Sequence, residues 1–533
     1  MYSKPTNIWI VSRECDGIAE AGGVKNVTCS LSEGLVEQGI KTTLFIPRYG
    51  CTNFSKIKNY INNVIPEQKI IVNNQEYIVS YDGAETYSGV KVIFIVHQIF
   101  SEKNEVYTYS AKDEELNALN CRGIGFHDTL EMDVLFQKAV VLYTLLDNQV
   151  DLIHCHDATT AIIPALTYYA NKDVFSKIKY VVTIHNAGPG YHHDFSSLNQ
   201  AIEYTNLPVE ILQNSMNYNR VEPFLIASKF AEISTVSPWY AEELINPANS
   251  ENTANLSVLF EAHKTVITGI TNGIDYSRYE PQHTDISLLP FPFNPLKGEF
   301  EGKISNRNYF INNYCLEKNI FSKDLSFTRH GFLNIDNEKS VLFCFHGRIV
   351  RQKGIDLLTQ AAKIAMDANP NIKFLILGQG EVELENNLIS LSSENKGGFL
   401  YFQGYEKALS RLVVAVSDFI LLPSRFEPCG LEDFIAQFFG TIPIAHATGG
   451  LNKILNEKTG FLYEENTPQI IANKIISIAD SFKLNKSFFV DLAKKASNYV
   501  QENYSWKNVI ENYYIPFYSS ISSKDFIYVS SKI

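Results

Sequence analysis

Apolar residues in this chain occur in short runs of strand length, followed by stretches in which they recur at the 3.6-residue spacing of a helix. The clearest run lies at residues 418–422, and the loop after it contains Glu427 and Gly430. The helix that follows has one apolar face, formed by Leu431, Phe434, Ile435 and Phe438. Free N–H groups at the start of such a helix bind anions, above all phosphate. An ordinary strand-to-helix turn shows the same pattern, but the Glu427 carboxylate beside it indicates chemistry on a phosphorylated ligand.

The same order of strand, loop, helix and strand opens the chain. Residues 7–12 predict a strand, 24–35 a helix and 41–47 a second strand, with the pair Gly22–Gly23 between the first two. This order is typical of the start of a doubly wound parallel sheet. The glycines do not form the G-x-G-x-x-G fingerprint of dinucleotide-binding proteins. The pair Gly22–Gly23 either lets the backbone approach a ligand or simply turns the chain.

Several predicted strands in the first half end at polar residues. Short alternating runs within 55–110, including 91–96, predict further strands, and residues 135–146 predict a buried helix. The strands at 151–155, 180–184, 232–236 and 266–270 are followed by His156–Asp157, His185–Asn186, Ser237–Pro238 and Asn272–Gly273, respectively. Open α/β sheets bind ligands at the carboxyl ends of their strands. One histidine at a strand end is more often structural, but several such ends in one sheet indicate a site.

The second half has its own series of strands and helices. Residues 276–335 lack strand periodicity, contain some helix at 305–317, and predict the crossing into a second domain. Strands are expected at 340–345, 373–377, 399–402, 418–422 and 442–445, a helix at 355–366, and a helical tail at 467–517. We therefore expect an α/β protein with two doubly wound, Rossmann-like domains, residues 1–270 and 271–504. Two such domains facing across a cleft would hold a donor and an acceptor.

Length and composition agree with this division. A chain of 533 residues is too long for one core, and its 45% hydrophobic and 20% charged residues are ordinary for a globular protein. The net charge of -12 argues against non-specific nucleic-acid binding, although a local basic cleft stays compatible with it. The eight cysteines include no C-x-x-C pair, which favours reduced thiols and no zinc site. Without an apolar segment of roughly 18 residues or a signal-peptide core, the sequence predicts a cytoplasmic protein with no membrane span.

The motifs resemble those of bacterial glycogen synthases and plant starch synthases, which are retaining glycosyltransferases of the GT-B fold that use a nucleotide-glucose donor. Residues 423–431 (Pro-Ser-Arg-Phe-Glu-Pro-Cys-Gly-Leu) are similar to the family's best-marked block, and residues 347–356 to its Arg-x4-Lys-Gly block. Further blocks lie at 156–157, 183–186, 235–242, 269–275, 404–405 and 448–450. Ser505–Trp506 resembles the start of the family's closing helix, so residues 505–533 are expected to return to the first domain.

The resemblance implies catalytic roles for five matched positions. Arg348 and Lys353 would hold the donor diphosphate and stabilise its charge as the glycosidic bond breaks. Glu427 would orient the sugar. His185 would contact the glucosyl hydroxyls, and Asp157 would lie near the reacting centre or the sugar. Two surface cations before a helix would give the same Arg-x4-Lys spacing without any such role.

Binding roles are implied for a second group of residues. The backbone N–H groups of Gly430 and Leu431 would contact phosphate, and Tyr405 would stack on the base. The pair Gly22–Gly23 would close over the phosphate from the first domain, and Asn272 at its strand end would contribute to the donor site. The resemblance implies neither a metal ion nor a cofactor, because fixed cations stabilise the leaving group.

The implied reaction is transfer of α-D-glucosyl units from ADP-glucose, with UDP-glucose as the other donor considered, to the non-reducing end of an α-1,4-glucan. Configuration would be retained by front-face attack within an ion pair, with the diphosphate helping to take the acceptor's proton. Domain closure would exclude water. Two other interpretations stay open. One is a GT-B glycosyltransferase with another donor or acceptor, and the other is a non-catalytic glucan-binding relative.

Three places depart from the family pattern. Glu20 stands where the family has lysine before its Gly-Gly, Glu432–Asp433 where it has Thr-Gln, and residues 158–160 where it has Trp-His-Thr. The added carboxylates would repel a diphosphate, by about 1 kcal/mol for unit charges roughly 4 Å apart in water and about 4 kcal/mol at an effective dielectric of 20. Glu432 could instead favour the helix dipole and point outward. Lys25 could take the place of the missing lysine, or this protein could use a donor and an acceptor other than the family's usual ones.

Overall fold

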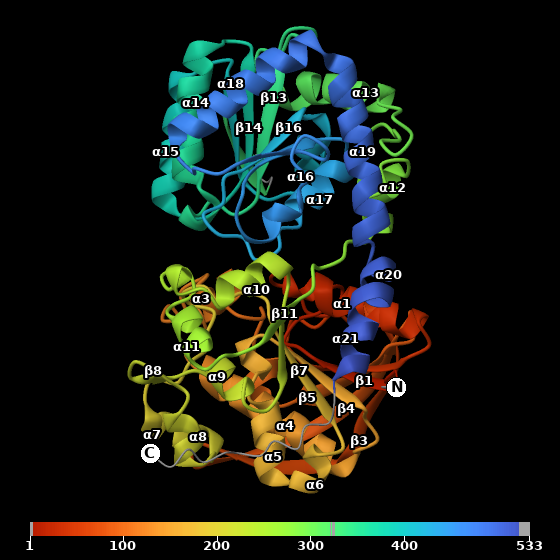
Figure 1. Ribbon diagram of the computed structural model, residues 1–533, viewed down its shortest axis with the longest axis vertical. Helices are drawn as coiled ribbons and strands as arrows, with labels where there is room; N and C mark the ends of the chain where they lie inside the picture. Colours follow the sequence, from red (N-terminus) through yellow and green to blue (C-terminus); the bar gives the residue numbers. More distant parts are fainter. Residues whose placement is uncertain (1–3, 320, 322–325, 522–533) are drawn as a thin grey trace. The chain divides into compact units, whose positions relative to one another are not determined.

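The structure is a computed structural model that describes residues 4–319, 321 and 326–521. The chain divides into two compact units (Figure 1). The first unit consists of the residues up to Gly273 together with the segment from Trp506 onward, and the second unit runs from Ile274 to Ser505. Each unit is built on its own large sheet, so each has its own core.

The first unit contains a nine-stranded sheet with the order β11-β10-β7-β6-β1-β2-β5-β4-β3. Its strands are β1 (Asn7–Val11), β2 (Lys41–Pro47), β3 (Ile57–Val72), β4 (Gln75–Thr86), β5 (Lys91–Val96), β6 (Leu152–His156), β7 (Lys179–Ile184), β10 (Glu232–Thr235) and β11 (Ile267–Gly269). Neighbours from β11 to β5 pair in parallel, whereas β4 pairs antiparallel with both β5 and β3. The strands other than β3 and β4 lie within one residue of their predicted ends.

One long antiparallel hairpin, β3–β4, replaces most of the short strands predicted within residues 55–110. The strands are joined by Asn73 and Asn74, whose φ angles of 49° and 59° suit the type I′ turn that two-residue hairpins prefer. Register shifts interrupt the pairing between Lys58 and Gln68, so the apolar alternation breaks into pieces that resemble separate strands. Two short helices, α2 (Gln98–Ser101) and α3 (Ala111–Leu116), follow β5.

Helices cover both faces of the first sheet. Trp9 of β1 packs against Tyr143 of α4, with ring centroids 5.5 Å apart. Ile10, the next residue of β1, faces the other side of the sheet from Trp9 and is the register partner of His154. His154 therefore lies on that other side, where its Nδ1 forms a hydrogen bond of 2.8 Å with the hydroxyl of Tyr518 of α21. The C-terminal helices therefore pack on the first unit (Figure 1). The helices of this unit are α1 (Val24–Glu37), α4 (Thr129–Leu146), α5 (Ile163–Ala170), α6 (Lys172–Phe175), α7 (Leu198–Thr205), α8 (Val209–Gln213), α9 (Pro223–Ala227), α10 (Pro238–Leu244), α11 (Leu256–Ala262), α20 (Trp506–Val509) and α21 (Ile515–Ser520).

The second unit contains a seven-stranded sheet with the order β12-β15-β14-β13-β16-β17-β18. Its strands are β12 (Phe327–Gly331), β13 (Val341–His346), β14 (Ile372–Gly378), β15 (Phe399–Gly404), β16 (Phe419–Leu422), β17 (Ile442–His446) and β18 (Phe461–Tyr463). All pairs are parallel except β12 with β15. β12 was not expected, because its sequence Phe-Thr-Arg-His-Gly contains no apolar run, as an edge strand allows.

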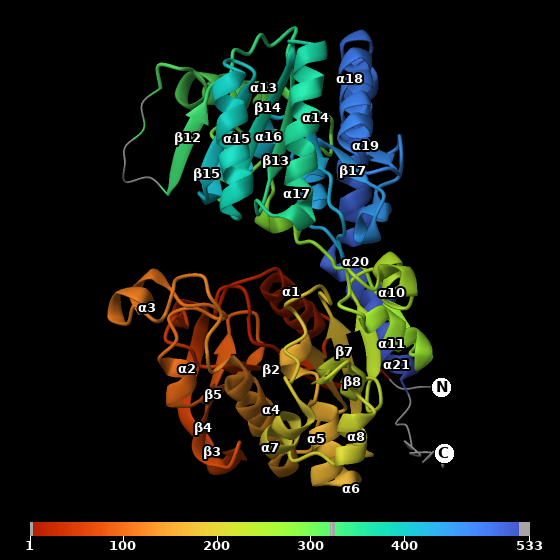
Figure 2. The ribbon, with the colours of Figure 1, turned by 90° about the vertical axis from the view of Figure 1, so that its left-hand side faces the viewer.

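Alternate residues of the central strand β13 enter two separate cores. Phe343 packs with residues of α14, α15, α18 and α19, whereas Leu342 and Cys344 pack with residues of α13 and α16 on the other face (Figure 2). Burial on both faces explains why these strands are continuous apolar runs. The predicted fold class, α/β with two doubly wound and mainly parallel sheets, is confirmed. The helices of this unit are α12 (Thr284–Ser287), α13 (Glu301–Phe310), α14 (Ile355–Ala368), α15 (Val382–Glu394), α16 (Lys407–Val416), α17 (Glu432–Phe438), α18 (Pro468–Leu484) and α19 (Lys486–Tyr504).

Each sheet reverses its direction of winding at one place, which we call its switch point. In the first sheet the chain adds β2 on one side of β1 and later β6 on the other, and in the second sheet it adds β14 and later β16 on opposite sides of β13. Open α/β sheets bind ligands at the carboxyl ends of the strands beside such a point. A ligand site is therefore expected in the loops after β1, β6, β13 and β16.

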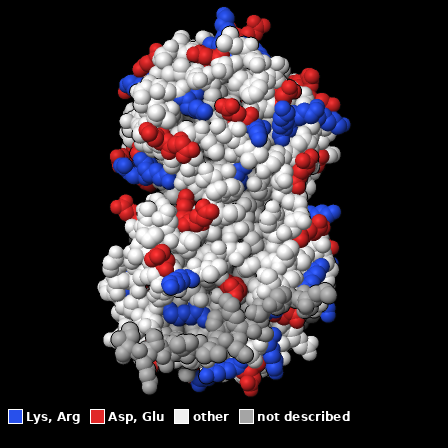
Figure 3. Space-filling view, viewed as in Figure 1, with Lys and Arg blue, Asp and Glu red and all other residues white. Residues whose placement is uncertain are grey.

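Charged groups are distributed over the visible surface. On the face shown in Figure 3, Lys and Arg side chains are interspersed with Asp and Glu side chains among the residues drawn in colour. Within the described part of the chain, no helix has both the length and the apolar character that a membrane span requires.

The start of α14 offers a test of how closely the loops at the second switch point pack. Gly354 has a φ of 69°, and a Cβ there would lie 2.0 Å from the carbonyl oxygen of Pro423. We expect Gly354→Ala to destabilise the protein by more than the roughly 1–2 kcal/mol that a left-handed backbone alone costs, because the two loops must also separate. The control is Gly298→Ala, whose φ is 81° but whose Cβ would meet only the flexible Lys494 side chain, at 3.2 Å. Equal losses in thermal unfolding for the two variants would contradict this close contact.

Candidate active site

A buried carboxylate organises the loop after β1. Glu14 is 1% exposed, and its Oε2 accepts hydrogen bonds from the backbone N–H groups of Ala21 (3.1 Å) and Gly22 (2.6 Å). Tyr107 donates to Oε1 at 3.2 Å. Burial raises the pKa of Glu14, although these hydrogen bonds act against the rise. The pair Gly22–Gly23 was expected to close over phosphate, but the N–H group of Gly22 is bound to Glu14, whereas a Cβ on Gly23 would meet open space.

Asp157 and His185, at the ends of β6 and β7, lie in direct contact. The backbone N–H of His185 donates to Asp157 Oδ1 at 2.7 Å. Asp157 has a φ of 62° and a ψ of 178°, a conformation that costs a residue with a side chain roughly 1–3 kcal/mol. Burial raises the pKa of Asp157 to about 7; hydrogen bonds from His185 and Asn186 oppose the rise, and Glu14 adds to it. A strained carboxylate that titrates near neutral pH is typical of a functional group.

Three histidine rings line up beside this contact. The ring centroids of His154 and His156 are 4.3 Å apart, and those of His156 and His185 are 5.1 Å apart. Burial lowers the pKa of all three, to about 3 for His154 and His185, so the rings are neutral at pH 7.

The hydrogen bonds of these rings favour one tautomer of His185. His156 Nδ1 lies 2.8 Å from His185 Nε2, and His156 Nε2 is buried without a hydrogen-bond partner in the described part of the chain. Orphaned buried N–H groups are rarer than orphaned acceptors, which places the proton of His156 on Nδ1, where it donates to His185. The proton of His185 is then on its own Nδ1. His185 thereby keeps an N–H group that can donate to a ligand.

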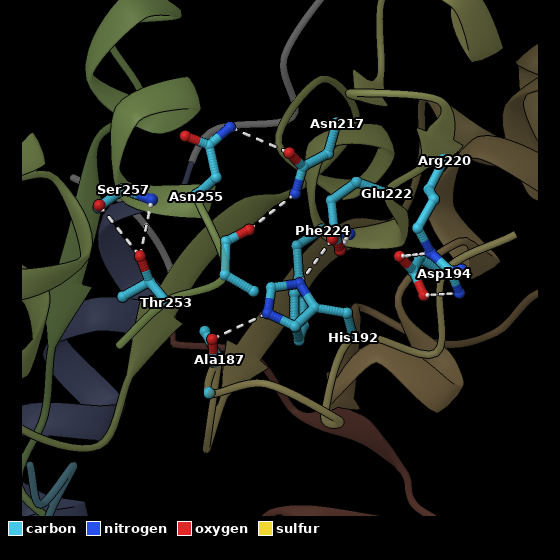
Figure 4. Close-up of polar contacts among 12 residues, drawn as sticks. Ala187, His192, Asp194, Asn217, Arg220, Glu222, Phe224, Thr253, Asn255 and Ser257 are labelled. Atoms are coloured by element: carbon cyan, nitrogen blue, oxygen red, sulfur yellow. Dashed lines mark hydrogen bonds and ion pairs between the residues drawn. The ribbon is translucent and has the colours of Figure 1, made fainter. Parts of the chain in front are cut away.

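A charged histidine fastens the loop after His185. His192 Nε2 lies 2.8 Å from the carbonyl oxygen of Ala187, and its Nδ1 lies 2.6 Å from the Glu222 carboxylate (Figure 4). A carbonyl and a carboxylate only accept, so both ring nitrogens of His192 carry protons. Burial disfavours this charge, but Glu222 and the two hydrogen bonds outweigh it and raise the pKa of His192.

Asn272 is the remaining site residue predicted in the first unit. Its side chain is 4% exposed, and its Oδ1 has no hydrogen-bond partner among the described residues. Within that same part of the chain, no hydrogen bond joins it to Asp157, to His185 or to the Gly22–Gly23 pair. A buried acceptor that lacks a partner is a group that a ligand can satisfy.

In the second unit, Lys353 and Glu427 join the loops on either side of the switch point. Lys353 Nζ lies 2.5 Å from Glu427 Oε2, and Ser424 donates to the same oxygen at 3.0 Å. The side chains of Lys353 and Glu427 are 20% and 11% exposed, so water screens their charges only in part. Arg348 is exposed on the same loop as Lys353, and its Nη2 lies 3.4 Å from Gln352 Oε1.

The loop between β16 and α17 presents backbone amides. Gly430 has a φ of 75°, and Leu431 is the N-cap residue of α17. Among the hydrogen bonds of the described residues, none is donated by the N–H group of Gly430 or Leu431. Since α17 has only seven residues, these two loop amides, and not the dipole of a long helix, are what this segment offers an anion.

Tyr405 follows β15 and is 52% exposed, with its ring centroid 6.4 Å from that of His346. His346 Nδ1 lies 2.8 Å from Glu432 Oε2. Burial opposes both charges, but the attraction between the partners prevails, so the pKa of His346 is raised and the pKa of Glu432 is lowered. Glu432 therefore does not point outward, as one interpretation of the sequence had it, because His346 at the end of β13 binds it.

The other acidic departures from the family pattern also have cationic partners. Glu20 Oε2 lies 2.6 Å from Lys25 Nζ, so Lys25 is engaged by the residue that stands in place of the family's lysine. Asp433 Oδ1 lies 3.0 Å from Lys453 Nζ, with the two side chains 0% and 1% exposed. Each added carboxylate is thus paired with a basic side chain of the chain itself. The described residues include no group of three or more His, Cys, Asp or Glu side chains suited to a metal ion.

Four residues of these sites were not singled out from the sequence. Two of them could have been suspected from their positions: Glu14 follows a predicted strand, and Lys453 follows the Gly449–Gly450 pair. Tyr107 and His192 could not, since their contacts join segments far apart in the chain.

Comparisons with known proteins extend over nearly the whole chain. Residues 7–257 match the profile of the starch synthase catalytic domain, and residues 330–491 match that of glycosyl transferases group 1. The chain is 29% identical over 531 residues to the glycogen synthase of Thermodesulfovibrio yellowstonii, covering 95% of this chain and 96% of that protein. It is 29% identical over 516 residues to the glycogen synthase of Flavobacterium johnsoniae, covering 95% and 97%.

The fold also resembles solved structures. The catalytic domain of starch synthase IV from Arabidopsis thaliana, solved with ADP and acarbose bound, aligns with a TM-score of 0.77 at 23% identity, covering 97% of this chain and 100% of that chain. A sucrose-phosphate synthase from Thermosynechococcus elongatus aligns with a TM-score of 0.56 at 14% identity, covering 97% and 100%.

A doubly wound sheet in each unit, with ionisable groups in the loops at both switch points, gives this protein the GT-B fold. The profiles and the full-length relatives define it more narrowly. The chain is similar to bacterial glycogen synthases and plant starch synthases over nearly its whole length, which confirms the resemblance inferred from its motifs.

Asp157→Asn separates a functional role of Asp157 from a structural one. A carboxyl group whose pKa rises from about 3.9 in the unfolded chain to about 7 in the folded protein costs stability as pH rises through that interval. Asparagine keeps the acceptor for the His185 N–H group without the charge. We expect the variant to be at least as stable as the wild type at pH 8 in thermal unfolding and to lose at least about tenfold in transferase rate. The exposed Asp173→Asn should change neither quantity, and a fully active Asp157→Asn would contradict the assignment.

Proposed function

We propose that the protein transfers α-D-glucosyl units from ADP-glucose to the non-reducing end of an α-1,4-glucan, with retention of configuration. The observation that carries the proposal is the contact between Lys353 and Glu427 beside Arg348 at the second switch point. It supplies two cations for a diphosphate and a carboxylate for the attached sugar. The donor is proposed by analogy with starch synthase IV, solved with ADP, and the acceptor by analogy with the glycogen synthases.

The donor would be held mainly by the second unit. The Arg348 guanidinium and the Lys353 ammonium would contact the diphosphate, and the N–H groups of Gly430 and Leu431 would bind its oxygens. The exposed ring of Tyr405 is available for stacking on the base. Lys353 is held by Glu427 before the donor arrives, which is the condition under which charge contacts are most effective.

In the chemical step, the bond between C1 of the glucosyl unit and the diphosphate oxygen breaks, and its electron pair goes to that oxygen. Arg348 and Lys353 would stabilise the new negative charge. The acceptor's hydroxyl oxygen forms the new bond to C1 from the face that the diphosphate leaves, and its proton passes to the departing diphosphate oxygen. No enzyme nucleophile is needed, and the configuration at C1 is retained.

Two groups of the first unit would bind the sugar. The Nδ1–H group of neutral His185 would donate to a glucosyl hydroxyl, and Asp157 would accept from another or lie near C1. The strain at Asp157 favours this role, because strained backbone is concentrated at functional sites. A cytoplasmic location is part of the proposal and is supported by eight cysteines that are all thiols.

The direct test is incubation with ADP-glucose labelled in the glucosyl unit, together with glycogen. We expect incorporation of label into the polymer and release of an equal amount of ADP, with UDP-glucose a poorer donor. Turnover of only a different nucleotide sugar would replace the donor in this proposal. Binding of glycogen without turnover of either donor would point to a non-catalytic relative and overturn the proposal.

Removing one cation should have a large effect on rate. We expect Arg348→Ala and Lys353→Ala each to lower the transfer rate by at least about a hundredfold, the effect of losing one preorganised charge contact. The matched control is Arg351→Ala on the same turn, because the Arg351 side chain is half exposed and pairs with the exposed Glu383. The measurement is the initial rate of transfer at saturating glycogen for the three variants and the wild type. A loss below about fivefold for Arg348→Ala or Lys353→Ala would contradict the assigned roles.

A further inference from the structure

A fully buried ion pair lies under the loop that presents the Gly430 and Leu431 amides. Lys453, at the end of the turn Gly449–Lys453, is 2% exposed, and Asp433 in the first turn of α17 is 0% exposed. Their charged atoms are 3.0 Å apart, and the ammonium also lies 4.5 Å from the centroid of the Phe434 ring. Neither residue takes part in the proposed chemical step, yet burying two charges is costly unless their surroundings are arranged for them.

The Lys453 ammonium is bound on all sides. Its Nζ donates to the carbonyl oxygens of Cys429 (2.5 Å), Gly430 (2.9 Å) and Gly450 (3.1 Å). Three N–H groups and three carbonyl oxygens match one to one. Asp433 supplies the compensating negative charge, and although burial raises its pKa to about 6, with Lys453 opposing the rise, it is mostly ionised at neutral pH.

The geometry of the peptide bond explains how the Lys453 ammonium orients the N–H groups of Gly430 and Leu431. In a trans peptide the C=O and the N–H of one unit point in opposite directions. The Cys429 carbonyl shares its peptide unit with the Gly430 N–H, and the Gly430 carbonyl shares its unit with the Leu431 N–H. Because both carbonyls bind Lys453 Nζ, both N–H groups point away from it. These are the two N–H groups that donate no hydrogen bond within the described residues.

The third carbonyl ties a second loop to the first. Gly450 binds Lys453 through its carbonyl, and its N–H donates to the carbonyl oxygen of Glu427 at 2.7 Å. A Cβ on Gly450 would lie 2.2 Å from the Cys429 carbonyl oxygen, so the two loops are in direct backbone contact. Lys453 therefore fixes the backbone that carries Glu427 as well as the two free amides.

We propose that Lys453, paired with Asp433, is a positioning residue for donor binding that turns the N–H groups of Gly430 and Leu431 toward the diphosphate. The inference rests on the proposed function for the identity of the anion, but not for the orientation of the amides. In this chain the pair also explains why Asp433 is tolerated where the family has a neutral residue. The Lys453–Asp433 pair as a whole adds no net charge next to the donor.

The test compares Lys453→Met with Lys303→Met. Lys303 is the matched control because its Nζ is likewise buried and donates to the carbonyls of Ala415 and Phe439 and to the hydroxyl of Thr441, away from the donor loop. Both variants should lose thermal stability. Only Lys453→Met should weaken ADP binding in calorimetry, by at least about tenfold, and raise KM for ADP-glucose more than it lowers kcat.

Hydrogen exchange gives a second readout that does not depend on the nucleotide. We expect amide exchange in peptides covering residues 426–434 to accelerate in Lys453→Met and to stay unchanged in Lys303→Met. If wild-type protein binds neither ADP nor UDP, the proposed function fails, and the exchange data still decide the positioning role.

A third variant keeps the test decisive if Lys453→Met does not fold. Asp433→Asn with Lys453→Met removes both charges together, so no unpaired charge is left buried. We expect this double variant to fold, to exchange rapidly at residues 426–434, and to bind ADP at least about tenfold more weakly. Wild-type exchange and wild-type ADP affinity in a folded variant without Lys453 would overturn the inference.

Discussion

The contact between the Lys353 ammonium and the Glu427 carboxylate is the interaction on which the proposed chemistry depends. It joins the loop after β13 to the loop after β16, the two strands that flank the reversal of the second sheet. A second ion pair lies beside it, since Nη1 and Nη2 of Arg425, in the loop after β16, bind the Asp356 carboxylate in the first turn of α14, each at 2.7 Å. The two ion pairs hold the loop after β16 against the segment that follows β13, so the charges are in place without reorganisation.

Pairing of charge extends from this contact through both proposed sites. Glu432 lies against His346, Asp433 against Lys453, and Glu20 against Lys25. A single buried charge without a partner costs several kcal/mol, so acidic residues close to an anion site can persist only when cations come with them. The net effect is that these loops differ in sequence from the family pattern without becoming more negative.

The fold was largely predictable because strands buried on both faces leave continuous apolar runs, as in β13 and β16. The β3–β4 hairpin and the edge strand β12 were not, since bulges and polar edge positions remove that signal. Motifs marked Lys353, Glu427, Asp157 and His185 because each lies in a segment that follows a strand. The sequence marked the positions of Asp433 and Lys453 but not their pairing, because the role of the pair depends on which carbonyl oxygens surround the Lys453 ammonium.

The bond between His154 and Tyr518 spans 364 positions of sequence. A ribosome adding roughly 5–20 residues per second needs on the order of 20–70 s to travel that distance. During synthesis the nascent first unit therefore has a complete set of β-strands but one incompletely covered face, while the entire second unit emerges. Binding of a chaperone to that face, or premature association between two nascent chains, has a time window set by the order of the elements in the gene.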